Sequence, residues 1–255
     1  MTLDFTLEKY RELCESMVEN YKPVSVVSYL TIKPSENSII VRHDVDRKPE
    51  NALKMAKLED DMGVTSTYYF RMQKGVFKPE IIKEIADMGH EVGYHYEVLD
   101  KAKGNFEEAI EIFEDELRRF REICEVKTVC MHGNPLTPWV NKDLWNRYDF
   151  KEFDIIGEPY ISIDYEKVLY LSDTGRTWGA KFSLKDVKAR GIDVKSTNDV
   201  IKLLKDRVTE DVCILTHPNR WSDNCIDWIT ELLWQNMKNV MKSIIKWRRR
   251  RYDYN

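Results

Sequence analysis

Short, continuously apolar runs alternate along the chain with longer segments in which apolar residues recur every three or four positions. The first pattern is typical of buried strands and the second of amphipathic helices. We therefore predict strands at residues 38–43, 64–70, 90–95, 127–132, 154–157, 168–172 and 212–217. Helices are predicted at residues 6–17, 49–62, 79–88, 105–120, 196–204 and about 226–247.

Capping residues mark the ends of several of these helices. Thr6 caps the first, Asn105 with Glu108 resembles a capping box, and Gly63 and Gly89 follow two others. Strands that alternate with helices at these lengths indicate βα units around a parallel sheet or barrel. No linker rich in Gly, Ser or Pro divides the chain, so we predict one α/β domain, 1–255, with a barrel core at about 38–247.

The chain has five histidines, and each lies at the start or end of a predicted strand. Four lie at carboxyl ends: His43, His95, His132 and His217. In a parallel barrel these ends share one face, so the four imidazoles are expected to converge there. One such histidine is more often structural than functional, but four at equivalent ends favour a metal or acid/base site.

Two carboxylates follow the strand Ile39–Val41, in the stretch Arg42-His43-Asp44-Val45-Asp46. Residues at i and i+2 of a strand face the same way, so Asp44 and Asp46 can serve one site. Imidazole and carboxylate ligands together suit zinc and similar divalent ions. The alternative interpretation is a salt-bridged loop after a strand.

Other polar residues follow the ends of the predicted strands. Arg71 ends the second, Glu158 and Tyr160 follow the fifth, and Asp173 and Arg176 follow the sixth. These side chains are candidates for binding substrate or for supporting the site. Asp173 and Arg176 can equally form an ordinary turn with a salt bridge.

Three motifs resemble the polysaccharide deacetylases, carbohydrate esterase family four. Asp44-Val45-Asp46 is similar to the paired aspartates that end that family's first strand. Gly89-His90-Glu91-Val92-Gly93-Tyr94-His95 is similar to the strand that carries the first metal histidine, and Leu215-Thr216-His217 to the strand that carries the catalytic acid. The resemblance extends to a diverged branch with a His-Asp-Val-Asp signature, and it implies a distorted (β/α)7 barrel that binds a divalent metal and removes N-acetyl groups from sugars.

The chain also departs from this pattern. Val45 separates aspartates that are adjacent in the family, and Leu99 stands where the second metal histidine is expected. Met131-His132-Gly133-Asn134-Pro135 replaces an Arg-x-Pro motif. We therefore expect His132 to take the vacant ligand position, with Leu99 away from the metal.

The resemblance implies a role for each candidate. Asp46, His95 and His132 are assigned to the metal, Asp44 is the general base and His217 the general acid, although the order of Asp44 and Asp46 could be reversed. Arg42 or Arg176 would orient Asp44 or hold the developing oxyanion. Candidates for substrate binding are Arg42, Tyr96, Glu97, Glu158, Tyr160, Asp173, Trp178 and Trp221, of which the aromatic residues would stack on sugar rings unless they belong to the core.

Composition restricts the partners and the cellular location that we expect for the chain. The formal net charge of -4 gives no general attraction to nucleic acid. No apolar run approaches the roughly 20 residues of a transmembrane helix. Five scattered cysteines without metal-type spacing indicate reduced thiols. We expect a cytoplasmic protein, and we read the basic run Arg248–Arg251 as a solvated tail rather than a contact to phosphate or an anionic surface.

The function predicted from these residues is metal-dependent removal of an N-acetyl group from a sugar or polysaccharide precursor, with zinc as the favoured metal. One alternative is an inactive barrel that only binds a glycan or sugar nucleotide. Another is a hydrolase of the same design that acts on an ester or a different C–N bond. The sequence does not predict an oligomeric state.

Overall fold

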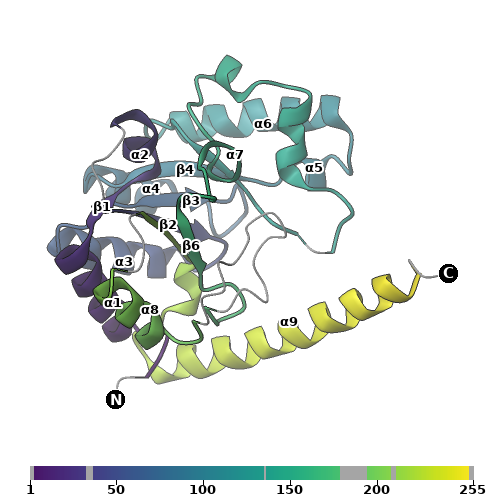
Figure 1. Cartoon of the computed structure of the whole chain (residues 1–255). Helices are drawn as coiled ribbons and strands as arrows, with labels where there is room; N and C mark the ends of the chain where they lie inside the picture. The colour runs from purple at the N-terminus through teal and green to yellow at the C-terminus, as the bar shows by residue number, and fades with distance from the viewer. Residues whose placement is uncertain (1–2, 33–36, 135, 179–193, 208–210, 253–255) are drawn as a thin grey trace.

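The computed structural model describes residues 3–32, 37–134, 136–178, 194–207 and 211–252, with side chains as far as Val240. Its centre is a seven-stranded sheet whose paired strands are all parallel (Figure 1). The strands are β1 (Lys22–Val24), β2 (Ser38–Val45), β3 (Thr67–Phe70), β4 (Glu91–Tyr96), β5 (Val129–Met131), β6 (Leu169–Ser172) and β7 (Val212–Thr216). The α-helices are α1 (Leu7–Asn20), α2 (Val26–Ile32), α3 (Pro49–Asp61), α4 (Pro79–Asp87), α5 (Val98–Lys101), α6 (Phe106–Arg121), α7 (Pro159–Ser162), α8 (Thr197–Lys205) and α9 (Cys225–Tyr252), with 3-10 turns η1 (Asn141–Asn146), η2 (Phe150–Phe153) and η4 (Pro218–Arg220).

The strand order is β5-β4-β3-β2-β7-β6, with β1 beside the first half of β2. Beyond β5 the sheet continues only as a short bridge, in which the amide of Ile156 donates to Lys127 and the amide of Val129 donates to Gly157. Among the described residues no pairing joins this end to β6. The predicted α/β class and distorted barrel of parallel strands are therefore confirmed, with the barrel open on one side.

Two details of the predicted strands are wrong. The strand expected at 154–157 is reduced to the bridge between Thr128 and Gly157, because Asp154 turns the chain in a left-handed conformation just before it. The three-residue strand β1 was not expected, since Pro23 at its middle breaks any strand pattern. The remaining strands lie where the apolar runs predict them.

The predicted helix ends agree closely with the structure. The Thr6 side chain accepts from the amide of Lys9, and Asn105 accepts from two amides of α6. Ser196 and Asp199 form a full capping box at the start of α8. Gly63 and Gly89 follow α3 and α4 with φ of +71° and +88°, which a residue with a side chain adopts only under strain. These turns return the chain to the amino ends of β3 and β4.

Apolar side chains pack on both faces of the sheet. The outer face is covered on one side by α4 and α6 and on the other by α1 and α8 (Figure 1). The inner face is narrower and contains Ile40, Tyr69, Cys130 and Cys213. A side chain at Gly93 would put its Cβ 2.3 Å from the ring of Tyr69, so only glycine fits inside the barrel there. Ile40 of β2 points inward. Because every second residue of a strand faces the same way, Arg42 and Asp44 point inward as well.

Candidate metal centre

The residues of the candidate centre lie at the carboxyl ends of adjacent strands. Asp44 is the second-last residue of β2 and Asp46 follows that strand. His95 lies in β4, and His132 comes directly after β5. Because β2, β3, β4 and β5 are neighbours in a parallel sheet, their ends meet at one edge.

Three of these side chains converge on one point. Nδ1 of His132 lies 3.1 Å from Oδ1 of Asp46 and 3.2 Å from Nε2 of His95, and the third side of this triangle measures 3.7 Å. Ligands bonded to tetrahedral zinc at 2.0–2.1 Å lie about 3.3 Å from one another, so the triangle fits such an ion. The Oδ1 atoms of Asp44 and Asp46 are buried and have no hydrogen-bond partner among the described residues. Unpartnered carboxylate oxygens beside two ring nitrogens are the donor set that a divalent cation needs.

The protonation states also suit a metal. Burial lowers the pKa of His95 to about 4. The charge of Asp44 acts to raise this pKa, and His132 acts to lower it. Burial raises the pKa of Asp46, but His132, His217 and His95 together bring it well below its usual value. Nδ1 of His95 lies 2.9 Å from the carbonyl of Cys130, which assigns the proton to Nδ1 and leaves the Nε2 lone pair facing the centre. Neutral imidazole and ionised carboxylate are the forms that bind metal.

Arg42 supports Asp44 from inside the barrel. Its guanidinium lies 4.0 Å from Oδ2 of Asp44 and donates to Sγ of Cys130 and to the hydroxyl of Tyr160. Arg42 is completely buried, so its predicted role in binding substrate is wrong, whereas its alternative role of orienting Asp44 matches its position. The ring of Tyr160 lies 4.6 Å from the same guanidinium, so Tyr160 holds Arg42 and is not a free platform for a sugar.

A second pair lies at the ends of β6 and β7. Nδ1 of His217 is 2.7 Å from Oδ1 of Asp173, and the backbone amide of His217 donates to Oδ2. Burial raises the pKa of Asp173, but Arg220 and His217 more than offset it, so this carboxylate stays ionised. Asp173 therefore fixes the orientation of His217 and supports the site rather than binding substrate. The imidazole of His217 also contributes to the lowered pKa of Asp46, so the two groups interact electrostatically.

Two side chains expected at the site lie on the other face of the sheet. His43 does not converge with the other three histidines, because its neighbour Asp44 points inward and alternation turns His43 outward. For the same reason Tyr96, next to His95, is buried outside the barrel, where its hydroxyl accepts from Trp145. The prediction that Tyr96 lines the substrate pocket is therefore wrong.

Arg176 also lies elsewhere than expected. Arg176 itself has a left-handed backbone conformation, with φ of +58°. Its guanidinium donates to the backbone carbonyl of Trp228 and lies over the ring of the same residue. Its proposed role beside Asp44 is therefore wrong, and Arg42 occupies that place.

Three further substrate-binding candidates belong to the core. Glu158 is buried as the N-cap of α7, and burial raises its pKa to about 7 despite bonds from the amides of Met131 and Tyr160. Trp178 donates to Thr197, and Trp221 donates to Asp173. All three are less than 4% exposed and cannot contact a sugar.

The loop after His95 follows the expected course in part. Glu97 follows β4 directly and pairs with Arg71 and Gln73. Burial raises its pKa, but Arg71 and, to a smaller extent, His132 bring it below its usual value. The side chain of Leu99 packs into the outer apolar cluster, as the departure from the family pattern predicts.

Two supporting residues were not identified from the sequence. Asn141 donates to the carbonyl of His132 and accepts from the amide of Leu99, which ties the two metal-site loops together. Arg220 donates to the carboxylate and carbonyl of Asp173. Nothing near Asn141 forms a motif, whereas the position of Arg220 three residues after His217 was a usable signal.

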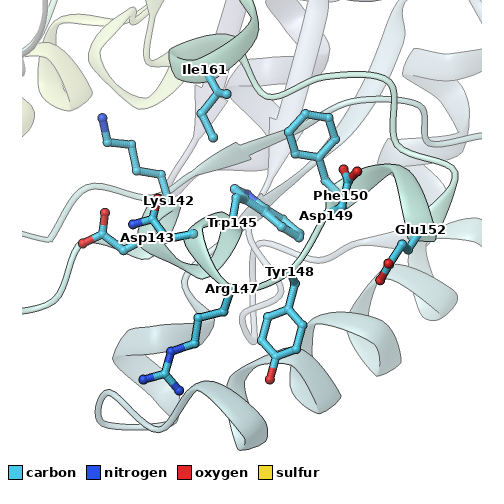
Figure 2. A pocket seen from close by; sticks show the side chains of 10 residues that line it. Lys142, Asp143, Trp145, Arg147, Tyr148, Asp149, Phe150, Glu152 and Ile161 are labelled. Carbon is cyan, nitrogen blue, oxygen red and sulfur yellow. The ribbon is translucent and has the colours of Figure 1, made fainter.

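A separate hollow of about 580 Å³ lies over the 3-10 turns η1 and η2. Figure 2 shows Trp145 in the middle of its lining, with Lys142, Arg147, Tyr148 and Phe150 around it. Trp145 donates to Tyr96, so this hollow is on the outer side of β4, opposite His95. It shares no residue with the candidate metal centre.

Comparisons with known proteins add little beyond this geometry. No family profile and no curated protein matches the chain. The solved structure of PdaA from Bacillus subtilis, a family 4 carbohydrate esterase, matches at 15% identity and a TM-score of 0.45, covering 87% of this chain and 83% of that chain. A likeness at this level transfers neither residues nor activity, so the functional argument rests on the centre itself.

Proposed function

We propose that this chain is a metal-dependent hydrolase that removes an N-acetyl group from a sugar or polysaccharide precursor. The observation that carries the proposal is the triangle of Asp46, His95 and His132, together with the buried and unpartnered Oδ1 of Asp44. Asp46 is assigned to the metal rather than Asp44, because its Oδ1 lies close to both ring nitrogens while Asp44 lies beside Arg42. The motifs around Asp44, His95 and His217 favour a deacetylase over other hydrolases.

A divalent metal such as zinc, held by Asp46, His95 and His132, would supply Lewis acidity toward the acyl carbonyl and a lowered pKa for the attacking water. Asp44 is the base that accepts a proton from the attacking water, and Arg42, 4.0 Å away, orients it. Nε2 of His217 delivers a proton to the departing amine, while Asp173 holds the ring through Nδ1. Glu97, fixed by Arg71, is the remaining polar candidate for contact with the sugar.

The test combines metal analysis with a search for acetate release. Purified protein is expected to contain one divalent metal per chain and to release acetate from an N-acetylated sugar nucleotide or lipid-linked sugar. Asp46→Ala should lose both properties, whereas Asp115→Ala, exposed on α6, should keep both.

Two results would replace this proposal. Metal-free protein that still binds an N-acetylated sugar would favour a binding barrel. Metal-loaded protein that leaves every amide intact but cleaves an ester would change the reaction.

A further inference from the structure

Helix α9 packs against the body of the protein with its polar face. Glu231 and Gln235 are 2% and 3% exposed. Glu231 accepts from Arg47 and Asn219, and Asn239 donates to the carbonyl of Gly175. The side of the helix that faces the protein is therefore held by hydrogen bonds and an ion pair.

The opposite face of α9 is apolar and exposed. Residues one turn apart form a stripe along it: Ile226 (79% exposed), Ile229 (51%), Leu233 (65%), Met237 (49%) and Val240 (59%). Trp234 lies beside this stripe and is 43% exposed. An amphipathic helix normally buries its apolar face, so this arrangement is inverted. A contiguous apolar surface of this kind marks an interaction site.

The charge of the same helix indicates what covers the stripe. From residue 232 to 252 the sequence contains Lys238, Lys242, Lys246 and Arg248–Arg251, and no Asp or Glu. A helix that combines an apolar face with Lys, Arg and Trp is typical of segments that lie in the interface of an anionic membrane. At 1.5 Å per residue its 28 residues extend for about 42 Å, and its carboxyl-terminal part projects beyond the body (Figure 1).

A second copy of the chain would cover the apolar stripe of α9 less well than an anionic membrane. In a parallel pair the two basic ends would lie side by side and repel each other. In an antiparallel pair each basic end would meet the first turns of the other helix, where Asp227 and Glu231 already pair with Lys48 and Arg47. The basic sequence of this end, which the sequence alone suggested was a solvated tail, instead favours a surface that carries lipid phosphates.

We propose that α9 lies flat on a bilayer that contains anionic phospholipid, with the stripe of Ile226, Ile229, Leu233, Met237 and Val240 among the acyl chains near the headgroups and the basic end on lipid phosphates. No described helix is long and apolar enough to cross a membrane, so this binding is peripheral. The inference is independent of the proposed hydrolase activity.

The experiment measures co-sedimentation with vesicles of phosphatidylcholine, with and without phosphatidylglycerol. The unaltered chain should bind the vesicles that contain phosphatidylglycerol, more weakly at high salt, and should bind pure phosphatidylcholine poorly. The double variant Leu233→Glu/Met237→Glu should lower the partition coefficient about tenfold or more, because two apolar side chains lose their burial. Replacing Arg248–Arg251 by Gln should lower it as well.

Ile32→Glu is the matched control, since Ile32 is 74% exposed on α2, away from α9. It should bind vesicles as the unaltered chain does, and circular dichroism should show every variant folded. The proposal is overturned if the unaltered chain does not bind anionic vesicles, or if the double variant binds them equally well. It is also overturned if the double variant converts a dimer into a monomer while vesicle binding is absent, which would assign the stripe to a second copy.

Discussion

Two polar clusters lie on opposite faces of the same strand, and His43 and Asp44 are their adjacent members. Asp44 faces the inside of the barrel with Asp46, His95 and His132. His43 faces outward, toward the buried carboxylate of Glu59 on α3. Both clusters combine imidazoles with carboxylates, so residue type alone does not separate them.

Their hydrogen bonding does separate them. Glu59 accepts from the hydroxyls of Tyr10, Ser66 and Tyr68 and from Nε2 of His43. The other nitrogen of His43 is 2.7 Å from the hydroxyl of Thr216, so that ring is also fully bonded. In the inner cluster, by contrast, Asp44 and Asp46 each keep a buried oxygen without a partner.

The difference distinguishes a structural cluster from a functional one. A saturated buried network stabilises the fold and has no capacity left for a ligand. Unpartnered buried oxygens cost free energy unless something else binds them. The predictions below follow from this contrast, and each would fail if the two clusters had the same role.

The largest effect is expected from His132→Ala. Loss of one of three protein ligands should remove the metal and reduce deacetylation to background. His90→Ala removes a histidine of the outer network, which lies 3.9 Å from Glu59, and should leave metal content unchanged in the folded protein. Elemental analysis of both variants measures this, and full metal occupancy in His132→Ala would disprove the assigned ligand.

The next effect is expected from His217→Ala. As general acid, His217 should contribute roughly 10²–10⁴-fold to turnover, and its loss should leave metal binding intact. Turnover and metal content are measured on the same preparation, with Asp46→Ala as the variant that loses both. If His217→Ala also loses its metal, His217 is a ligand and the acid must be another group.

The sequence predicts the inner cluster well because its residues follow strand ends. Apolar runs locate β2, β4, β5 and β7, and parallel pairing alone brings the ends of these strands together. Asp46, His95 and His132 are therefore close in space without any information on helices or loops. Asp173 lies beside His217 for the same physical reason, since β6 and β7 are neighbours.

The errors arise from the two faces of a strand. His43 is expected at the site because it lies near the carboxyl end of a strand, and Tyr96 because it follows His95. Alternation, however, sends the neighbours of Asp44 and His95 to the opposite face of the sheet. Trp178 and Trp221 could not be assigned, since an aromatic side chain suits a sugar and a core equally well. Glu59 lies in the last turn of α3, and no local pattern shows that four donors from other elements surround it.

A smaller effect is expected from Glu59→Ala. The substitution leaves the buried hydroxyls of Tyr10, Ser66 and Tyr68 and the ring of His43 without their acceptor. This should lower the free energy of unfolding by about 3–5 kcal/mol, measured by urea denaturation. Glu84→Ala, which removes an exposed ion pair with Lys57, should cost less than about 1 kcal/mol. Equal losses in the two variants would show that the outer network is not structural.

The smallest effect concerns acid stability. Burial raises the pKa of Glu59, but His43, His90 and the bond from Tyr10 outweigh it and lower the pKa to about 2, from an ordinary 4.5. The unfolded chain therefore takes up this proton first as the pH falls, so the folded state loses about 3 kcal/mol of relative stability between pH 4.5 and about pH 2. Glu59→Gln cannot titrate, and its stability should fall less steeply over that window. Other carboxylates titrate in both proteins, so the difference between the two curves belongs to Glu59 and the groups bonded to it. Parallel curves from urea denaturation at each pH would mean that folding leaves the pKa of Glu59 unchanged, and the outer network would then not stabilise its charge.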